Sequence, residues 1–263
     1  MTTPFDAVIA QIKRRGFHNQ RLEEHSDIVS KGIFADLREQ CAPFGTDLAA
    51  GSIASWLNVP TPGARNRKID LLVGEGDSDG KPNFEKLHLC LENKSVVTAH
   101  RNQYARFDDL NEALQVIHNA KAEAVLVATV IVGVATRVLN VPDRIKPLFR
   151  TNLAEFNEQI MPRLSSGDQT LLWTQFPSAV SINRASDSAK TLNKFRELPT
   201  RAPGHTHVRG YDYVLLVPMF IDNVNPPYIP EPDDPLSLGI NVREEYRIML
   251  ETICKAYTAR WHL

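Results

Sequence analysis

The chain has 263 residues, of which 43% are hydrophobic and 23% are charged, and its formal net charge is −1. This composition is ordinary for a folded globular protein, and the length suffices for one large domain with a substantial core. The near-neutral charge argues against indiscriminate, charge-dominated binding to nucleic acid. It leaves room for a local basic cleft.

The three cysteines, Cys41, Cys90 and Cys254, are widely spaced and form no CxxC pair. We therefore expect neither a zinc ribbon nor a disulfide framework. The first residues show no signal-peptide pattern, and the longest apolar run, 122–135, is interrupted by Glu123 and too short to cross a bilayer. These features predict a cytoplasmic protein without membrane association.

Helical spacing of apolar residues predicts a short helix over 5–15, and the Ser26-Asp27 pair predicts the N-cap of a second helix that runs to about Gln40. Residues 51–57 fit either a short helix or a strand. A proline-rich loop follows at 60–63.

Two strands come next, over 68–73 and 86–97, and the glycine- and aspartate-rich turn at 74–80 predicts that they form a hairpin. The turn lacks the glutamate and the flanking helices of a calcium-binding EF-hand loop. Thr98 is the expected N-cap of a helix that ends near Lys121. Residues 124–134 are apolar on both faces, which is typical of a central strand. The remaining expected elements are a helix at 153–164, a strand at 211–221 and a terminal helix at 242–260.

This order predicts an α/β fold of the mixed-sheet (α+β) kind, with helices on both faces of a central sheet. We expect a single domain over 1–263. Its core would lie in 20–135, and residues 136–263 would complete the sheet and supply recognition or dimerisation elements.

The strand at 86–97 carries the chemistry, because side chains alternate between the two faces of a strand. We expect its leucines to face one way and its polar residues the other, namely Leu87, Leu89 and Leu91 against His88, Cys90, Glu92 and Lys94. Asp70 can reach Glu92 and Lys94 from the neighbouring strand. Two acids and a lysine at one point suggest a divalent metal site that cuts a phosphodiester. The alternative is an ordinary salt-bridge network at a strand end.

In this strand–hairpin–strand–helix–strand context, Asp70 and Glu92-Asn93-Lys94 resemble the motif of the PD-(D/E)xK nuclease superfamily, which includes many type II restriction endonucleases. The resemblance covers roughly residues 20–135, and it departs from the pattern at Ile69, where proline is frequent. It implies a restriction-endonuclease-like core. It also implies a third acid from the early helix, for which Glu24 and Glu39 are candidates unless they are plain surface residues.

The chemistry requires a cation with oxygen ligands and a group that holds the attacking water. Asp70, Glu92 and the backbone carbonyl of Asn93 are the expected ligands of Mg²⁺, which Mn²⁺ could replace. Lys94 is expected to hold or activate the water and to offset charge at the phosphate.

Basic residues near this point are candidates for contacts with nucleic acid, although short basic runs are often only solvated surface. One group precedes the first strand, one begins the helix after Lys94, and one lies in the basic segment 184–209. The candidates are Arg65, Arg67, Lys68, His100, Arg101, Arg184, Arg201 and Arg209.

The leading hypothesis from the sequence is a Mg²⁺-dependent endonuclease that acts on double-stranded DNA, as a homodimer, in a restriction or other defence system. One alternative is a non-catalytic nucleic-acid-binding protein with the same fold. Another is a repair or RNA-processing nuclease with the same chemistry and a different substrate.

Overall fold

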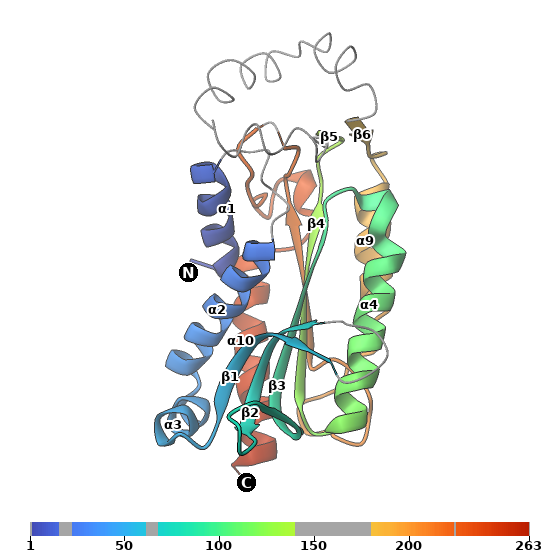
Figure 1. The fold of residues 1–263 in the computed structure, drawn as a ribbon. Helices are drawn as coiled ribbons and strands as arrows, with labels where there is room; N and C mark the ends of the chain where they lie inside the picture. Colours follow the sequence, from blue (N-terminus) through green and yellow to red (C-terminus); the bar gives the residue numbers. More distant parts are fainter. Residues whose placement is uncertain (1, 16–22, 62–67, 140–179, 224, 263) are drawn as a thin grey trace.

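A five-stranded mixed sheet lies between two layers of helices in the computed structural model, which describes residues 2–15, 23–61, 68–139, 180–223 and 225–262 (Figure 1). The strands are β1 (Ala54–Pro60), β2 (Lys68–Gly76), β3 (Pro82–Val96), β4 (Val125–Gly133) and β7 (Tyr213–Met219). The helices are α1 (Pro4–Arg15), α2 (Glu23–Gln40), α3 (Ala42–Ala50), α4 (Ala99–Ala120), α9 (Asp187–Arg196) and α10 (Val242–Trp261). Strands β5 (Arg137–Leu139) and β6 (Val180–Ile182) form a separate pair, and a 3₁₀ turn, η3, covers Pro235–Ser237.

The sheet has the strand order β1-β2-β3-β4-β7. The first three strands run antiparallel as consecutive hairpins, and β3, β4 and β7 run parallel. Because a parallel return needs a crossover, α4 joins β3 to β4. β4 is buried at every position, as its apolar sequence predicted.

The two helical layers differ in the face of the sheet that they cover. In Figure 1, α1, α2, α3 and α10 lie on one side, and α4 and α9 lie on the other. The expected fold class, a mixed sheet flanked by helices, is therefore confirmed.

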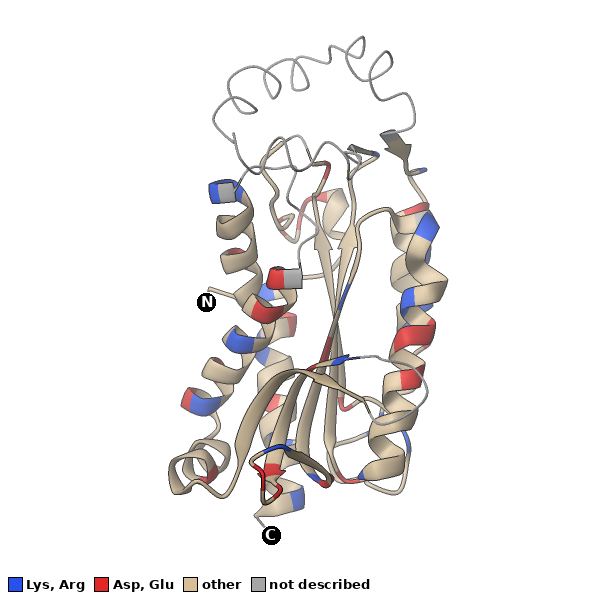
Figure 2. Ribbon diagram, in the orientation of Figure 1, with Lys and Arg blue, Asp and Glu red and all other residues tan. Residues whose placement is uncertain are grey.

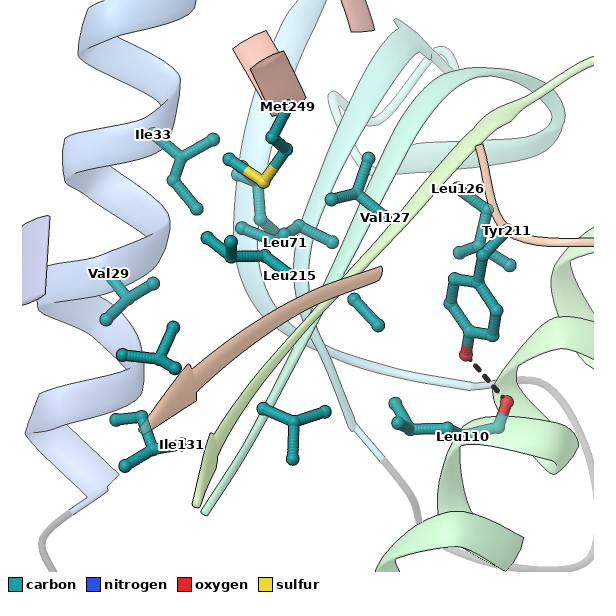
Figure 3. Packing of buried hydrophobic residues seen from close by; sticks show 14 of the residues in the cluster. Val29, Ile33, Leu71, Leu110, Leu126, Val127, Ile131, Tyr211, Leu215 and Met249 are labelled. Carbon is teal, nitrogen blue, oxygen red and sulfur yellow. Dashed lines mark hydrogen bonds between the residues drawn. The ribbon is translucent and has the colours of Figure 1, made fainter. Parts of the chain in front are cut away.

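The core fills the space between the sheet and these layers. Figure 3 shows Val29 and Ile33 of α2 facing Leu71 and Leu215 of the sheet. On the α4 side, the buried hydroxyl of Tyr211 donates a hydrogen bond of 2.7 Å to the carbonyl of Leu110. Its one polar atom is thus paired inside the core.

Most predicted elements are present with boundaries shifted by a few residues. The predictions that the structure confirms are the helices at 5–15, 98–121 and 242–260, with Thr98 as the N-cap of α4, and the strands at 68–73, 86–97, 124–134 and 211–221. Residues 51–57, left open between helix and strand, contribute to β1. The helix expected at 153–164 lies outside the described residues.

In the N-terminal third, one local prediction is wrong and one helix was missed. α2 already includes Glu23, so Ser26 lies within the helix and is not its N-cap. Its Oγ accepts a hydrogen bond of 3.1 Å from Nδ2 of Asn93 on β3 instead. The helix α3 was not expected, and it begins directly after Cys41, with proline in its first turn.

The expected alternation of β3 fails at His88. The pairing with β2 shifts between Val73↔Leu89 and Gly74↔Leu87, which marks a bulge on β3 at His88. The His88 ring therefore turns to the α10 face and stacks on Trp261 with ring centroids 4.0 Å apart. The prediction that His88 shares a face with Glu92 is wrong for this reason.

The expectation that the cysteines stay unpaired is also wrong. Cys41, between α2 and α3, forms a disulfide with Cys254 of α10, with Cα atoms 5.4 Å apart. The fold brings together two cysteines separated by 213 residues, and spacing in the sequence gives no sign of such a pair. Cys90 is free and buried in β3.

No helix among the described residues combines the length and apolar character needed to cross a bilayer.

Candidate active site

The candidate site lies where β2 and β3 separate. The two strands pair as far as Leu71↔Leu91, after which β2 stays with β1 and β3 stays with β4. Asp70 stands at this fork, and its Oδ2 accepts a hydrogen bond of 2.6 Å from the backbone N–H of Asn93. A carboxylate thus takes the place of the strand partner that this amide lacks beyond the fork.

Glu92 and Lys94 project from β3 at the same point. They are two residues apart on a strand and so share one face. The Lys94 Nζ lies 2.5 Å from Oε2 of Glu92. Glu92 is only 2% exposed, so its carboxyl group is held inside the protein. The structure therefore brings Asp70, Glu92 and Lys94 together, as the motif required.

The surroundings of Glu92 disfavour the ionised form of its carboxyl group. Burial is the largest influence and raises the pKa of Glu92 to about 8, and the carboxylates of Asp70 and Asp109 act in the same direction. Lys94 opposes them without restoring an ordinary value. Burial of the Glu92 carboxyl group thus outweighs the effect of the lysine beside it. A divalent cation bound at this point would favour the ionised form.

Figure 2 shows how unusual this placement is within the sheet. Charged positions cover the helices in both signs, but the strands are mostly uncharged apart from the β2–β3 turn and the middle of the sheet. Charged side chains at buried strand positions are rare in proteins without a partner or a function.

Asn93, between the two charged residues, turns its side chain to the opposite face. Nδ2 donates to Oγ of Ser30 at 2.8 Å, and Oδ1 accepts from Oγ1 of Thr129 at 2.7 Å. This amide therefore fixes β3 against α2 and β4. Only its backbone carbonyl is left for a cation, as the sequence suggested.

A cavity of about 330 Å³, here named the acidic cavity, opens beside Glu92 and Lys94. Its acids are Glu92 with Asp109 and Glu112 of α4. Sequence reasoning missed Asp109 and Glu112. Their i, i+3 spacing on the helix that directly follows the motif strand was the available signal.

The donor set is small. Within the part of the chain that the structure describes, no group of three or more His, Cys, Asp or Glu residues is arranged to hold a metal ion. Asp70 and Glu92 supply two carboxylates. That number fits Mg²⁺, which usually keeps several waters and takes one or two carboxylates with substrate phosphates.

Neither candidate for a third acid lies at the acidic cavity. Glu24 and Glu39 are both exposed on α2, and neither lines the acidic cavity. The reason is geometric, because α2 covers the face of the sheet toward which Asn93 points.

The predicted DNA-contacting residues are scattered. Lys68 is exposed at the start of β2 and lines the acidic cavity, and Arg101 is exposed in the first turn of α4. Arg184 is exposed before α9. Arg209 is exposed too, and it donates to the side-chain oxygen of Asn119 at 2.7 Å, near the far end of α4. Arg65, Arg67 and the side chain of His100 lie outside the described residues.

Arg201 does not lie on the surface, so the prediction that it contacts nucleic acid is wrong. Its guanidinium is buried and pairs with the Asp212 carboxylate, with Nη2 3.1 Å from Oδ2. It also donates to the carbonyls of Ala122 and Ala124. Arg260 binds the same carboxylate from α10. Arg201 thus belongs to an internal ion cluster.

Comparison with protein-family models, with curated proteins and with solved structures found no match to this chain. The case for a function therefore depends on the geometry at the fork.

Proposed function

We propose that this protein is a Mg²⁺-dependent endonuclease that hydrolyses DNA phosphodiester bonds, as part of a restriction or other defence system. The observation that carries the proposal is the convergence of Asp70, Glu92 and Lys94 at the fork between β2 and β3. The resemblance to the PD-(D/E)xK superfamily supports it, since the strand, hairpin, strand, helix and strand occur in the expected order.

In the proposed reaction a water oxygen attacks the phosphorus, the bond to one ester oxygen breaks, and that oxygen takes a proton. Lys94 holds the water and offsets the negative charge that develops on the phosphate. Asp70 and Glu92, with the carbonyl of Asn93, would hold Mg²⁺. The chemistry that Mg²⁺ supplies when bound is neutralisation of phosphate charge and acidification of water.

The substrate would approach from the α4 side, to which Glu92 and Lys94 project. Lys68, which lines the acidic cavity, and Arg101 at the start of α4 are exposed cations suited to backbone phosphates. A homodimer would present two such sites to the two strands of a duplex. We also propose that the protein acts in the cytoplasm, although a disulfide such as Cys41–Cys254 is rare in that compartment.

The test is cleavage of plasmid DNA by wild type, Asp70→Asn and Lys94→Gln, in Mg²⁺ and in EDTA. We expect wild type to cut only with Mg²⁺ and each variant to lose at least a hundredfold in rate. Lys86→Ala is the matched control, because Lys86 is a lysine of the same strand in an exposed pair with Glu75. Equal nicking by all four proteins would contradict the proposal. Single-stranded DNA and structured RNA as further substrates would identify a repair or RNA-processing nuclease.

A non-catalytic nucleic-acid-binding protein is the second candidate. The observation that favours it is the direct contact between Lys94 and Glu92, which occupies both groups with each other. This candidate predicts retention of DNA in a gel-shift assay without cleavage. It also predicts no change in thermal stability on adding Mg²⁺.

A further inference from the structure

A second cavity, of about 420 Å³, adjoins the proposed active site. We name it the apolar cavity after the valine, isoleucine and methionine side chains that α1, α2, β4 and β7 contribute to about half of its lining. The other lining residues are polar or charged, namely His25, Ser26, Asn93, Ser95, Asn102 and Thr129, with Lys94 and Arg106. Its volume falls within the range of about 300–1,000 Å³ that is usual for small-molecule sites.

The two cavities meet at two cations. Lys94 and Arg106 line both the apolar cavity and the acidic cavity. Lys94 comes from β3, and Arg106 comes from α4, where its Nη1 lies 2.9 Å from Oδ2 of Asp109. An anionic group at this junction would share Lys94 with Glu92 and Arg106 with Asp109. It would have a chamber of mixed apolar and polar lining on one side.

A nucleotide has the matching chemistry. Its phosphate is an anion suited to a lysine and an arginine, and its base has apolar faces with hydrogen-bonding edges. A base inside a duplex has its faces covered by its neighbours, so only an unstacked base could enter a chamber of this kind.

We propose that the apolar cavity is a nucleobase subsite, which holds the unstacked base next to the phosphate that Lys94 and Arg106 contact. This inference rests on the proposed function and extends it. It assigns a substrate class, DNA that is locally unpaired at the point of cleavage, so that one base leaves the stack.

The first test measures binding and does not depend on cleavage. Deoxyadenosine 5′-monophosphate and 2-deoxyribose 5-phosphate, which lacks the base, are titrated into the protein in EDTA by calorimetry. We expect the nucleotide to bind at least tenfold more tightly than the sugar phosphate. Equal affinities, or no binding of either at millimolar concentration, would overturn the proposal.

The variant Asn102→Trp locates the site. Asn102 is exposed on α4 and lines the apolar cavity, so tryptophan there would block the cavity at little risk to the fold. The matched control is Ala105→Trp, three residues along the same helix at an exposed position that does not line the cavity. We expect a tenfold loss of nucleotide affinity in the first variant and no change in the second. The same loss in both would contradict the assignment.

The second test uses cleavage. Oligonucleotides with one abasic position, moved stepwise along the strand, are cut by wild type in Mg²⁺. Removal of the base beside the scissile phosphate is expected to lower kcat/KM at least tenfold, and removal elsewhere is expected to have little effect. Cleavage at the same rate wherever the abasic position lies would contradict the proposed subsite but not the proposed nuclease activity. Absence of cleavage with every substrate would contradict the nuclease activity, and the calorimetry would still test the subsite.

Discussion

At the scale of single residues, the buried Glu92 has a pKa well above that of an exposed glutamate. Its folded pKa is raised to about 8, above the ordinary value of 4.5, by burial and by neighbouring carboxylates. The folded state therefore binds more protons than the unfolded state between these pH values. The stability that Glu92 contributes to the fold is therefore fully present below pH 4.5 and is lost as the pH rises toward 8.

The corresponding experiment compares wild type with Glu92→Gln in EDTA. We expect the melting temperature of wild type, relative to the variant, to fall steadily from pH 5 to pH 9. A difference that stays constant over this range would show that Glu92 is ionised in the fold despite its burial.

His118 is expected to give the opposite trend. Burial, followed by the nearby Arg201, lowers the pKa of His118 to about 4 from 6.5. The unfolded chain takes up the proton at a higher pH than the folded one, so stability is lost as the pH falls from 6.5 toward 4. The loss should be on the order of 2 kcal/mol.

Urea unfolding of wild type and His118→Gln at pH 7 and pH 5 tests this. Wild type should lose more stability than the variant on acidification. An equal loss in both proteins would mean that His118 stays accessible to protons in the folded state.

At this scale the sequence predicted the site better than its surroundings. Asp70, Glu92 and Lys94 could be paired because strand alternation and a hairpin fix their relation. The face of His88 could not be predicted, since one bulge reverses the alternation. The burial of Arg201 could not be predicted either, because the sequence alone does not distinguish a buried arginine from an exposed one.

At the scale of elements, the Asp212 cluster joins α10 to the start of β4. Asp212 accepts from the backbone N–H of Leu126 at 2.9 Å and from the guanidinium groups of Arg201 and Arg260. The side chains of Asp212 and Arg201 are fully buried. Removing the carboxylate would leave two guanidinium groups without their counterion.

We predict that Asp212→Asn destabilises the fold by about 3–5 kcal/mol in chemical denaturation. Arg247→Ala is the control, because Arg247 forms exposed pairs with Glu244 and Glu251 on the outside of α10. That control should shift the denaturation midpoint far less. Comparable shifts in the two variants would argue against the importance of the buried cluster.

The disulfide is the second link between elements, and it closes a loop that includes most of the chain. Cross-links that close long loops stabilise a fold by about 2–5 kcal/mol, largely by restricting the unfolded chain. We predict that a reductant lowers the melting temperature of wild type but not of Cys254→Ser. Alkylation of the denatured, unreduced protein should label one cysteine, Cys90. Labelling of three would mean that the bond does not form.

The helices and strands whose apolar residues recur with a clear period could be predicted from the sequence. The elements that depend on tertiary contacts could not. β4 is apolar on both faces and was placed as a central strand, which its complete burial confirms. α3 is short, and its residues carry no strong helical stripe, so nothing in 42–50 separated it from a loop.

At the scale of the whole molecule, the sheet should be most stable at its centre. β3 and β4 have hydrogen-bonded neighbours on both sides, whereas β1 and β7 are edge strands, and β1 is the more exposed of the two. Native-state hydrogen exchange should therefore be slowest in β4 and fastest, among the strands of this sheet, in β1. Exchange in β4 as fast as in β1 would mean that the centre of the sheet opens independently of the rest.

The architecture could be predicted because hydrophobic periods, a hairpin turn and a central apolar strand agree on one arrangement. The two cavities could not be predicted from the sequence. They are formed by side chains from several elements, and their shape depends on where β2 leaves β3.

That departure has a consequence for the solubility of the protein. Beyond Leu91, no described strand pairs with the side of β3 that β2 has left, so β3 has an unpaired margin there. Open strand margins invite pairing with other chains, and natural proteins discourage it with charges, lysine above all. Lys94 lies on this margin, so an apolar substitution there would promote aggregation in addition to the loss of the activity that we propose. A polar replacement such as Lys94→Gln keeps these two effects apart.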